Sequence, residues 1–303
     1  MALSEPSGLL ILNKPIGITS HDCVYKIRRL YSTKRVGHTG TLDPLATGVL
    51  VMLVGRAAKA AEYLSADTKG YVATLRLGIT TDTEDITGKI LTESHDIPSA
   101  DKVRAVANGF LGDIKQIPPM YSAIKVGGKK LYDLAREGIT VEREARDVTV
   151  HSLTVTPTDD IAKYTLSVEC SSGTYIRTLC ADIGNALGSG GVMETLLRTR
   201  VGNFKLSEAH TPEELEAMSE DERISLLLPI EKLFDSLPSV YLPAFYERLC
   251  RNGCEIYEKK IKTNLSVGER VKLYSEKGVF FALGEVREYP DGNAIKAIKI
   301  FEL

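Results

Sequence analysis

One carboxylate stands alone in a glycine-rich stretch near the N-terminus. Residues 36–48 read VGHTGTLDPLATG, with Asp43 as the lone acid, and the apolar run VLVMLVG follows directly. An Asp among turn residues usually accepts backbone N–H bonds as a turn former or cap. The alternative is chemical, because a carboxylate held ionised at a half-buried site can act as a nucleophile. That role requires an arginine close by to lower the carboxyl pKa and orient the group, and only the fold can bring one there.

Sequence motifs for nucleotide cofactors and metals are absent. Neither G-x-x-x-x-G-K-[ST] nor a G-x-G-x-x-G after a strand pattern occurs, so phosphate cradles of those kinds are not expected. The five histidines are scattered without metal-ligand spacing, which argues against a metal site. They are His21, His38, His95, His151 and His210. The acidic cluster of Asp82, Glu84 and Asp85 lacks the full calcium-loop pattern, and we expect a solvated turn there.

Length and composition indicate a folded, globular chain. Its 303 residues are enough for one large domain and a small one. With 43% hydrophobic and 26% charged residues, neither disorder nor a coiled coil is indicated. The five cysteines are odd in number and form no C-x-x-C pair, which favours free thiols. No leader pattern and no membrane-spanning run is present, so a cytoplasmic location is expected.

Charge is unevenly distributed along the chain. Residues 1–80 hold ten Lys and Arg against five Asp and Glu, a local charge of +5, whereas residues 204–240 hold three against nine, a local charge of −6. The basic segment could face nucleic-acid phosphates, although a solvated helix face is the more ordinary interpretation of such a charge run.

The elements that must position Asp43 can be outlined from local patterns. The apolar run 9–12, ended by a Pro and Gly turn, predicts a first strand, and Ser20 could cap the helix that follows. Residues 49–55 and 70–78 predict strands on either side of an Ala-rich helix at 56–64. The chain therefore begins as a mixture of α and β.

Further along, mixed elements continue up to an acidic connector. We expect a helix near 100–111, a short strand turned by Gly127 and Gly128 into a helix closed by Gly138, two long strands within 147–170, and a helix ending near Gly188. Residues 207–235 are acidic and rich in Leu and Glu, and two prolines close together mark a boundary after them. The last ~60 residues alternate in short runs that indicate a small β barrel or sandwich.

Several blocks of the sequence together resemble the TruB family of pseudouridine synthases. GHTGTLDPLATG resembles the family's catalytic motif, KGYVATLRLGITTDTEDITG its tyrosine motif, and CSSGTYIRTLCADIGNALG its third motif. The opening GLLILNKPIGITSHD and the middle IPPMYSAIKVGGKKLYDLAREG also fit, so the resemblance covers about residues 8–235. Five blocks in the same order are far more specific than any one of them.

The resemblance implies roles for individual residues. It makes Asp43 the nucleophile, Tyr71 the aromatic that stacks on the target base and serves in proton transfer, and Arg177 the ion-pair partner of Asp43. The remaining implied contacts are to the flipped base, to the RNA loop and to the motif loops. Tyr175 and Leu197, with Leu196 as the alternative to Leu197, would pack around the base, His38 would fill space vacated in the RNA loop, and Lys14 would support the motif loops. For Tyr71 and Leu197 the competing interpretation is plain core packing.

The implied reaction detaches uridine from C1′ through N1 and rejoins it through C5, without redox change, metal or nucleotide cofactor. Asp43 could form a covalent adduct or stabilise a glycal, and the sequence does not choose between them. The base must be flipped out of a folded RNA loop at a cost of a few kcal/mol, and an aromatic face offsets this cost. Basic side chains available for phosphates include Lys26, Arg28, Arg29, Lys34, Arg35, Lys129 and Lys130.

The resemblance also predicts the fold, the domains and the partners. We expect an α+β catalytic domain at 1–235, with a mixed, mostly antiparallel central sheet flanked by helices and an RNA-gripping insertion near 119–147. A small PUA-like RNA-binding domain would follow at 236–303. The expected substrate is the T-stem-loop of tRNA at position 55, acted on by a monomer without an obligate protein partner.

Two rival functions remain open from the sequence. The first is the catalytic subunit of a guide-RNA-dependent complex, which normally has a longer segment before the first motif than MALSEPSG. The second is a non-catalytic RNA-binding protein, against which the presence of Asp43, Tyr71 and Arg177 argues.

Overall fold

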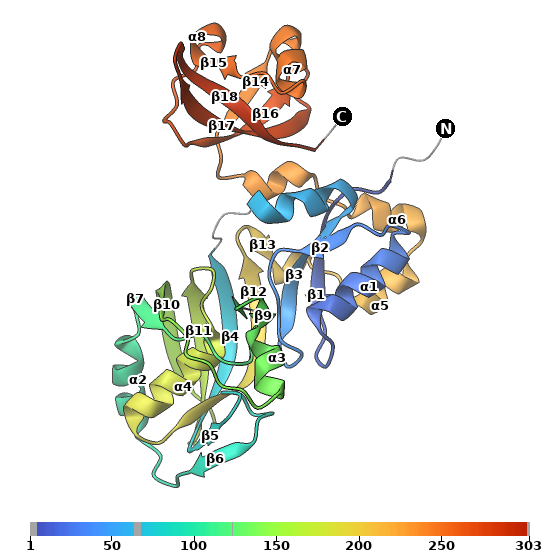
Figure 1. The fold of residues 1–303 in the computed structure, drawn as a ribbon. Helices are drawn as coiled ribbons and strands as arrows, with labels where there is room; N and C mark the ends of the chain where they lie inside the picture. The colour runs from blue at the N-terminus through green and yellow to red at the C-terminus, as the bar shows by residue number, and fades with distance from the viewer. Residues whose placement is uncertain (1–4, 64–67, 123, 302–303) are drawn as a thin grey trace.

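The computed structural model describes residues 5–63, 68–122 and 124–301. The large domain is built on a nine-stranded sheet, and a smaller five-stranded sheet follows at the C-terminal end (Figure 1). None of the described helices is long and apolar enough to span a membrane.

The central sheet is antiparallel except at one place. Its strand order is β1-β3-β12-β4-β11-β10-β7, with β2 pairing to β3 and β13 to β12. The bounds are β1 Gly8–Lys14, β2 Val36–His38, β3 Thr47–Val54, β4 Lys69–Leu77, β7 Gly112–Gln116, β10 Arg146–Pro157, β11 Lys163–Cys170, β12 Gly191–Val201 and β13 Phe204–Lys205. The expected mixed, mostly antiparallel sheet is therefore confirmed, whereas β12 was not expected from the local sequence pattern.

The exception is the contact between β3 and β12, which run parallel and pair only at Leu197 with Thr47 and Arg198 with Gly48. We call this contact the seam. Gly48 has φ +101°, and a Cβ there would lie 2.2 Å from the carbonyl oxygen of Arg198. Only glycine allows the two backbones to approach this closely, so Gly48 is a requirement of the seam.

The half of the sheet that contains β1, β2 and β3 is covered by α1 (Ser20–Leu30) and by the 3₁₀ segment η1 (Gly55–Tyr63). Two local predictions are wrong here. The cap of α1 is Thr19, which forms a capping box with Asp22, and Ser20 instead exchanges hydrogen bonds with the backbone of Leu42 in the loop before Asp43. The Ala-rich segment forms 3₁₀ turns and is no α-helix.

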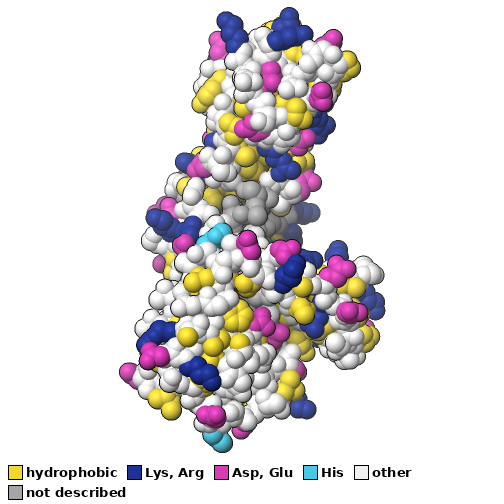
Figure 2. Space-filling view, turned by 90° about the vertical axis from the view of Figure 1, so that its left-hand side faces the viewer, with side chains coloured by type: hydrophobic (Ala, Val, Ile, Leu, Met, Phe, Trp, Pro, Cys, Tyr) yellow, Lys and Arg dark blue, Asp and Glu magenta, His cyan; other side chains and the backbone are white. Residues whose placement is uncertain are grey.

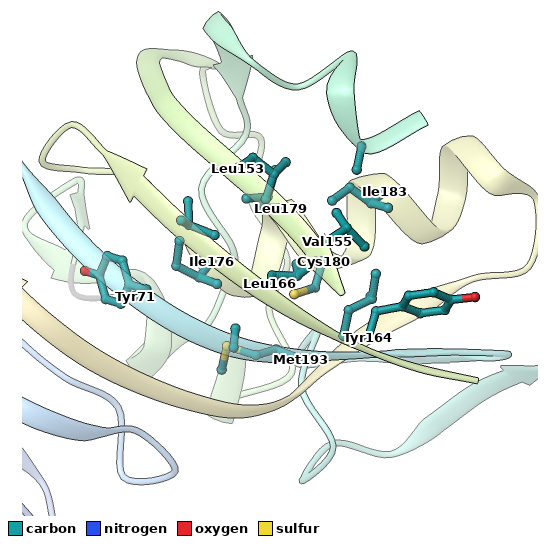
Figure 3. Packing of buried hydrophobic residues seen from close by; sticks show 14 of the residues in the cluster. Tyr71, Leu153, Val155, Tyr164, Leu166, Ile176, Leu179, Cys180, Ile183 and Met193 are labelled. Carbon is teal, nitrogen blue, oxygen red and sulfur yellow. The ribbon is translucent and has the colours of Figure 1, made fainter. Parts of the chain in front are cut away.

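The other half of the sheet is covered by α2 (Ala100–Asn108) and α4 (Ile176–Leu187). Ile176, Leu179 and Ile183 of α4 pack on the strands, and Figure 3 shows Tyr71 of β4 at one end of this core. Helix α4 ends at Gly188 with φ +79°, as the sequence predicts. The other end of α4, its first turn at Ile176, lies near Tyr71 at that end of the core (Figure 3).

Two hairpins project from this second half. The first joins β5 (Ile79–Thr81) and β6 (Ile90–Glu93). The second belongs to the 119–147 insertion and joins β8 (Lys125–Val126) and β9 (Lys129–Lys130) before α3 (Leu131–Arg136). Gly127 and Gly128 have φ of +59° and +85°, the pattern of a tight hairpin turn. The double glycine thus joins two short strands, where the sequence suggested one strand turned into a helix.

The acidic connector forms η2 (Leu206–Glu208), α5 (Pro212–Ala217), α6 (Glu220–Ser225) and η3 (Ile230–Phe234). It packs along β1 through bridges at Leu9–Leu228 and Leu12–His210. Glu216 of α5 lies 3.1 Å from Arg29 and 3.9 Å from Lys26 of α1. The basic face of α1 is therefore partly neutralised within the protein, and contact of Lys26 and Arg29 with phosphates stays a prediction.

The C-terminal sheet has the order β14-β16-β17-β18-β15. Its strands are β14 Ser239–Leu242, β15 Ile256–Tyr257, β16 Arg270–Ser275, β17 Phe280–Tyr289 and β18 Gly292–Ile300, with helices α7 Ala244–Arg251 and α8 Glu258–Ile261. It has a core of its own, and a second cluster containing Phe234, Phe280 and Phe301 packs it against the large domain. The short alternating runs at the end of the chain thus form the expected small β-rich unit.

Candidate active site

Asp43 lies in the loop between β2 and β3, on the first half of the sheet. Its carbonyl oxygen accepts a hydrogen bond from the Ala46 N–H at 3.0 Å, so its backbone does form a turn. Its side chain, 37% exposed, is left for another partner, and Oδ2 lies 3.1 Å from Nε of Arg177. The turn and the ion pair are therefore both properties of Asp43, one of the backbone and one of the carboxylate.

Arg177 extends from the first turn of α4, on the second half of the sheet, and its side chain is only 6% exposed. Nη1 donates to the carbonyl of Thr83 at 3.2 Å, and Nη2 donates to the carbonyl of Tyr121 at 2.7 Å. Nη1 also lies 3.5 Å from Oδ2 of Asp85. The guanidinium is thus held by two segments, the turn at residues 83–85 and the residues around Tyr121, and directs its Nε–H at Asp43.

Asp85 is a residue that sequence reasoning missed, because its acidic cluster was expected to be a solvated turn. The side chain is 8% exposed. Oδ1 accepts hydrogen bonds from the Thr83 hydroxyl at 2.9 Å and from the Thr87 N–H and hydroxyl at 2.9 and 2.6 Å. The threonines that flank Asp85 in the sequence were the available signal, since they satisfy one carboxylate oxygen and leave the other for Arg177.

Opposing effects act on the Asp43 carboxyl. Burial raises its pKa above the usual value, the charge of Arg177 lowers it, and the charge of Asp85 raises it again. Lys14 and Arg198 add smaller lowering effects. The site therefore holds a carboxylate that is partly desolvated yet paired, the condition under which an Asp oxygen becomes a reactive nucleophile.

Lys14 supports the loop that contains Asp43. The residue is fully buried, and Nζ donates to the carbonyls of Pro15 at 2.9 Å, Ile18 at 2.8 Å and Pro44 at 3.5 Å. Burial lowers its pKa. Because Pro44 follows Asp43 directly, this lysine restrains the loop beside Asp43.

Tyr71 lies on β4 and is 8% exposed. Burial raises the pKa of its phenol, and the guanidinium of Arg198 on the facing strand opposes that rise. Tyr71 shares a hydrophobic cluster with Leu42, Ala46 and Leu196. Its ring thus lies between the core and the loop that contains Asp43.

The two candidate leucines lie on opposite faces of the sheet. In the register of β12 with β4, Arg198 pairs with Tyr71 and Leu196 with Ala73, whereas Leu197 pairs with Val72. Paired residues project to the same face of a sheet and neighbours along a strand alternate. Leu196 therefore shares the face of Tyr71, and Leu197 projects away from it toward Gly48.

Tyr175 precedes α4 and is fixed through its backbone. Its N–H donates to Oε1 of Gln116 at 2.7 Å, and its carbonyl accepts from Nε2 of Gln116 at 3.0 Å. Burial raises the pKa of its phenol, and the charges of both Arg177 and Asp43 act on it. Tyr175 thus belongs to the same site.

His38 ends β2, and burial followed by the charge of Arg198 lowers its pKa. Within the described ranges no group hydrogen-bonds its buried Nδ1. The imidazole is therefore held neutral at the entrance to the Asp43 loop.

Lys129 and Lys130 belong to the β8–β9 hairpin, and each contacts a residue of the same 119–147 insertion, in or directly after α3. Lys129 is 3.7 Å from Glu137, and Lys130 Nζ donates to the Tyr132 hydroxyl at 2.9 Å. On the face shown in Figure 2, Lys and Arg are interspersed with Asp and Glu and form no single basic patch.

The comparisons with known proteins agree with this architecture. Residues 28–176 match the family model for the N-terminal domain of TruB family pseudouridylate synthases, and residues 177–235 match that for the C-terminal domain of tRNA pseudouridylate synthase B. The chain belongs to the TruB family of pseudouridylate synthases.

Curated relatives and solved structures extend the match. Proteins named tRNA pseudouridine synthase B from Alkaliphilus oremlandii and Bacillus subtilis are 44% and 43% identical, over 98% and 91% of this chain and 98% and 92% of their own lengths. A chain in a crystal structure of a Cbf5–Nop10–Gar1 complex superposes with a TM-score of 0.75 at 27% identity, covering 97% of this chain and 84% of that one. The expected family and fold are thereby confirmed.

Proposed function

We propose that the protein isomerises the T-loop uridine at position 55 of tRNA to pseudouridine, with Asp43 as nucleophile. The observation that supports this most directly is the 3.1 Å contact between Asp43 Oδ2 and Arg177 Nε, in a chain of the TruB family. Relatives that share almost the whole length of the chain bear the name tRNA pseudouridine synthase B.

The chemistry follows from the groups at the site. The N1–C1′ bond of the flipped uridine breaks and N1 leaves with the bonding electron pair, the base turns, and C5 bonds to C1′. The C5 proton then leaves and N1 gains a proton, so the net proton count is unchanged. The Asp43 carboxylate either forms a covalent adduct or stabilises a glycal during the exchange. Arg177 keeps that carboxylate ionised and oriented, since a guanidinium beside an acid favours its charged form. Tyr71 offers the aromatic face for the base and a phenol for proton transfer.

We assign the base-packing role to Leu196 in place of Leu197, because Leu196 shares the face of Tyr71. Tyr175 completes the apolar wall, His38 occupies space left in the RNA loop, and Lys14 maintains the Asp43 loop. The proposal is complete with protein side chains and needs no metal or nucleotide cofactor.

The outer parts of the chain are proposed to hold the RNA. The 119–147 insertion grips the stem-loop, with Lys129 and Lys130 on its hairpin, and the PUA-like unit at 236–303 binds another part of the tRNA. We propose that the protein acts in the cytoplasm as a monomer and without a protein partner.

The test uses tRNA transcripts labelled with [5-³H]uridine, followed by mass-spectrometric mapping of the product. We expect tritium release and a single pseudouridine at position 55. Asp43→Asn should still bind a T-stem-loop RNA but release no tritium, whereas Asp101→Asn, at an exposed site on α2, should behave as the parent does. Substantial turnover by Asp43→Asn would refute the nucleophile, and product elsewhere would refute the position.

The solved Cbf5 structures favour one second candidate, a guide-RNA-dependent catalytic subunit. The two functions differ in what must be added. Turnover of free tRNA without guide RNA or other protein supports the stand-alone enzyme, and strict dependence on a guide would overturn it.

A further inference from the structure

Arg198 is a buried cation on β12, only 1% exposed, at the seam of the central sheet. Its guanidinium donates three hydrogen bonds to main-chain carbonyls. Nε donates to Val49 at 2.7 Å, Nη2 to Gly40 at 3.1 Å and Nη1 to Thr41 at 3.3 Å. Two of these carbonyls lie in the loop that carries Asp43, within three residues of it.

The charge of Arg198 is compensated in an unusual way. Among the described residues no carboxylate lies within ion-pair distance of it, so the main-chain carbonyl dipoles and the Tyr71 side chain carry most of the compensation. Burying an arginine without a carboxylate partner is costly, and desolvation accordingly lowers its pKa. A leucine or methionine at this position would pack without that cost, so the cost calls for a reason beyond packing.

The position of Arg198 between the two halves of the sheet supplies that reason. Asp43 belongs to the half with β3, whereas Tyr71 and Arg177 belong to the half with β4 and α4. Between β3 and β12, both within the described residues, the two halves meet through two residue pairs. All three carbonyls bound by Arg198 lie across that seam, while Tyr71 faces Arg198 on its own side.

We propose that Arg198 is a positioning residue for the reaction: it fastens the Asp43 loop to the half that carries Arg177 and Tyr71, and so sets the alignment of carboxylate, guanidinium and aromatic ring. The inference rests on the proposed function. Because Arg198 is buried, it acts through the loop and through its hydrogen bond to the Tyr71 side chain, and it makes no ion pair with the Asp43 carboxylate.

A lysine at position 198 would keep the charge but lose the fork of donors that reaches three carbonyls at once. We expect Arg198→Lys to lower the single-turnover rate by about 100-fold, the scale of a loss of alignment of about 1 Å. Its Kd for a T-stem-loop RNA should stay within about threefold of the parent, since Arg198 is out of reach of the RNA.

The matched control is Arg200→Lys on the same strand. Arg200 pairs with Glu169 at 2.7 Å at a more exposed position, and its replacement should leave the rate within about twofold. All rates are taken per folded molecule, with the folded fraction measured by circular dichroism at the assay temperature.

A second variant separates positioning from simple stability. Arg198→Gln keeps a planar donor but removes the positive charge. In the parent this charge lowers the pKa of Asp43, as do those of Arg177 and Lys14, whereas burial and the charge of Asp85 raise it. The acid limb of its pH–rate profile should therefore move to higher pH, an effect that a loss of stability would not produce. If Arg198→Lys unfolds below the assay temperature, the pH–rate profile of Arg198→Gln alone tests the positioning role.

The outcomes are distinguishable from those that test the proposed function. An inactive parent on the same RNA would refute that function. An active parent with both Arg198 variants within threefold of the Arg200 control, and an unmoved acid limb, would overturn the positioning role.

Discussion

The Nε of Arg177 lies 3.1 Å from Oδ2 of Asp43, although the two residues come from opposite halves of the central sheet. The same guanidinium binds the carbonyls of Thr83 and Tyr121 and lies beside Asp85. Its orientation is thus fixed by the turn at residues 83–85 and by the Tyr121 carbonyl in the absence of RNA, so the group paired with the Asp43 carboxylate cannot easily turn away.

Arg177→Lys should lower the single-turnover rate by about 100-fold or more. A lysine ammonium can approach Asp43, but it cannot also reach the Thr83 and Tyr121 carbonyls in the fixed geometry of a guanidinium. Rapid-quench tritium release measures the rate, and filter binding measures RNA affinity. A variant with near-parental rate, or one whose defect lies in RNA affinity alone, would contradict the role given to Arg177.

The reaction should slow on acidification, with a midpoint above the ordinary Asp pKa of about 3.9. Burial raises the pKa of Asp43, and the nucleophile must be ionised. A pH–rate profile under single-turnover conditions gives this midpoint, and a midpoint at or below the ordinary value would contradict the prediction.

The same shift predicts the stability of Asp43→Asn. A folded-state pKa above the unfolded one means that stability is greatest when Asp43 is protonated and declines as pH rises through that window. At neutral pH the ionised side chain therefore disfavours folding relative to a neutral isostere. Thermal melts at pH 7 should show Asp43→Asn at least as stable as the parent, and a clearly lower melting temperature would argue against this sign.

Leu196→Ala should reduce kcat/KM about tenfold more than Leu197→Ala, because only Leu196 shares the face of Tyr71. Leu196→Ala also leaves a cavity in a buried cluster, at a cost of ~2–5 kcal/mol in stability. Both variants are therefore assayed well below their melting temperatures. The reverse order would return the base-packing role to Leu197.

Phosphate contacts should come from the insertion more than from α1. Replacing Lys129 and Lys130 together by Gln should reduce the slope of log K against log salt by about one unit for each phosphate that the hairpin no longer binds. The matched pair is Lys26 and Arg29, which already lie beside Glu216, and replacing it should change the slope by less. A larger effect from the α1 pair would show that RNA displaces these ion pairs.

Much of the fold could be predicted from local patterns, because its strands and helices follow clear periodicity. β12 is one exception, alongside the 3₁₀ segment η1 and the two short strands joined at Gly127 and Gly128. Irregularities interrupt the pairing of β12 with β4, so its side chains do not alternate regularly between the two faces. Polar residues, Arg198 among them, also interrupt its apolar residues, so the sequence does not show the apolar run of a buried strand. The cap of α1 was missed for a simpler reason, since Thr19 and Ser20 can both cap and only Thr19 has an acid three residues on.

The site was less predictable than the fold. Asp43 could be recognised through its family motif, but its local pattern alone describes a turn, which its backbone also forms. The burial of Asp85 was not predicted, because a cluster of acids normally indicates a solvent-exposed turn. Its buried carboxylate is paired with Arg177, which is 92 residues away in the sequence. The burial of Arg198 could not be predicted either. A basic residue on a strand is expected at the surface unless the hydrogen-bond acceptors that surround its side chain are known.

The seam also bears on how the protein is made. Val49 and Arg198 are separated by 149 residues, so their contact closes a long loop and adds non-local pairing that is slow to form. During synthesis the N-terminal half of the sheet can fold while Arg177 and β12 have yet to leave the ribosome. A nascent or truncated chain that ends before β12 would contain Asp43, Tyr71 and Arg177 but lack Arg198, whose hydrogen bonds join the Asp43 loop to the second half of the sheet. Such a chain could meet RNA without modifying it, so catalytic competence is acquired late, as one of the last events of folding.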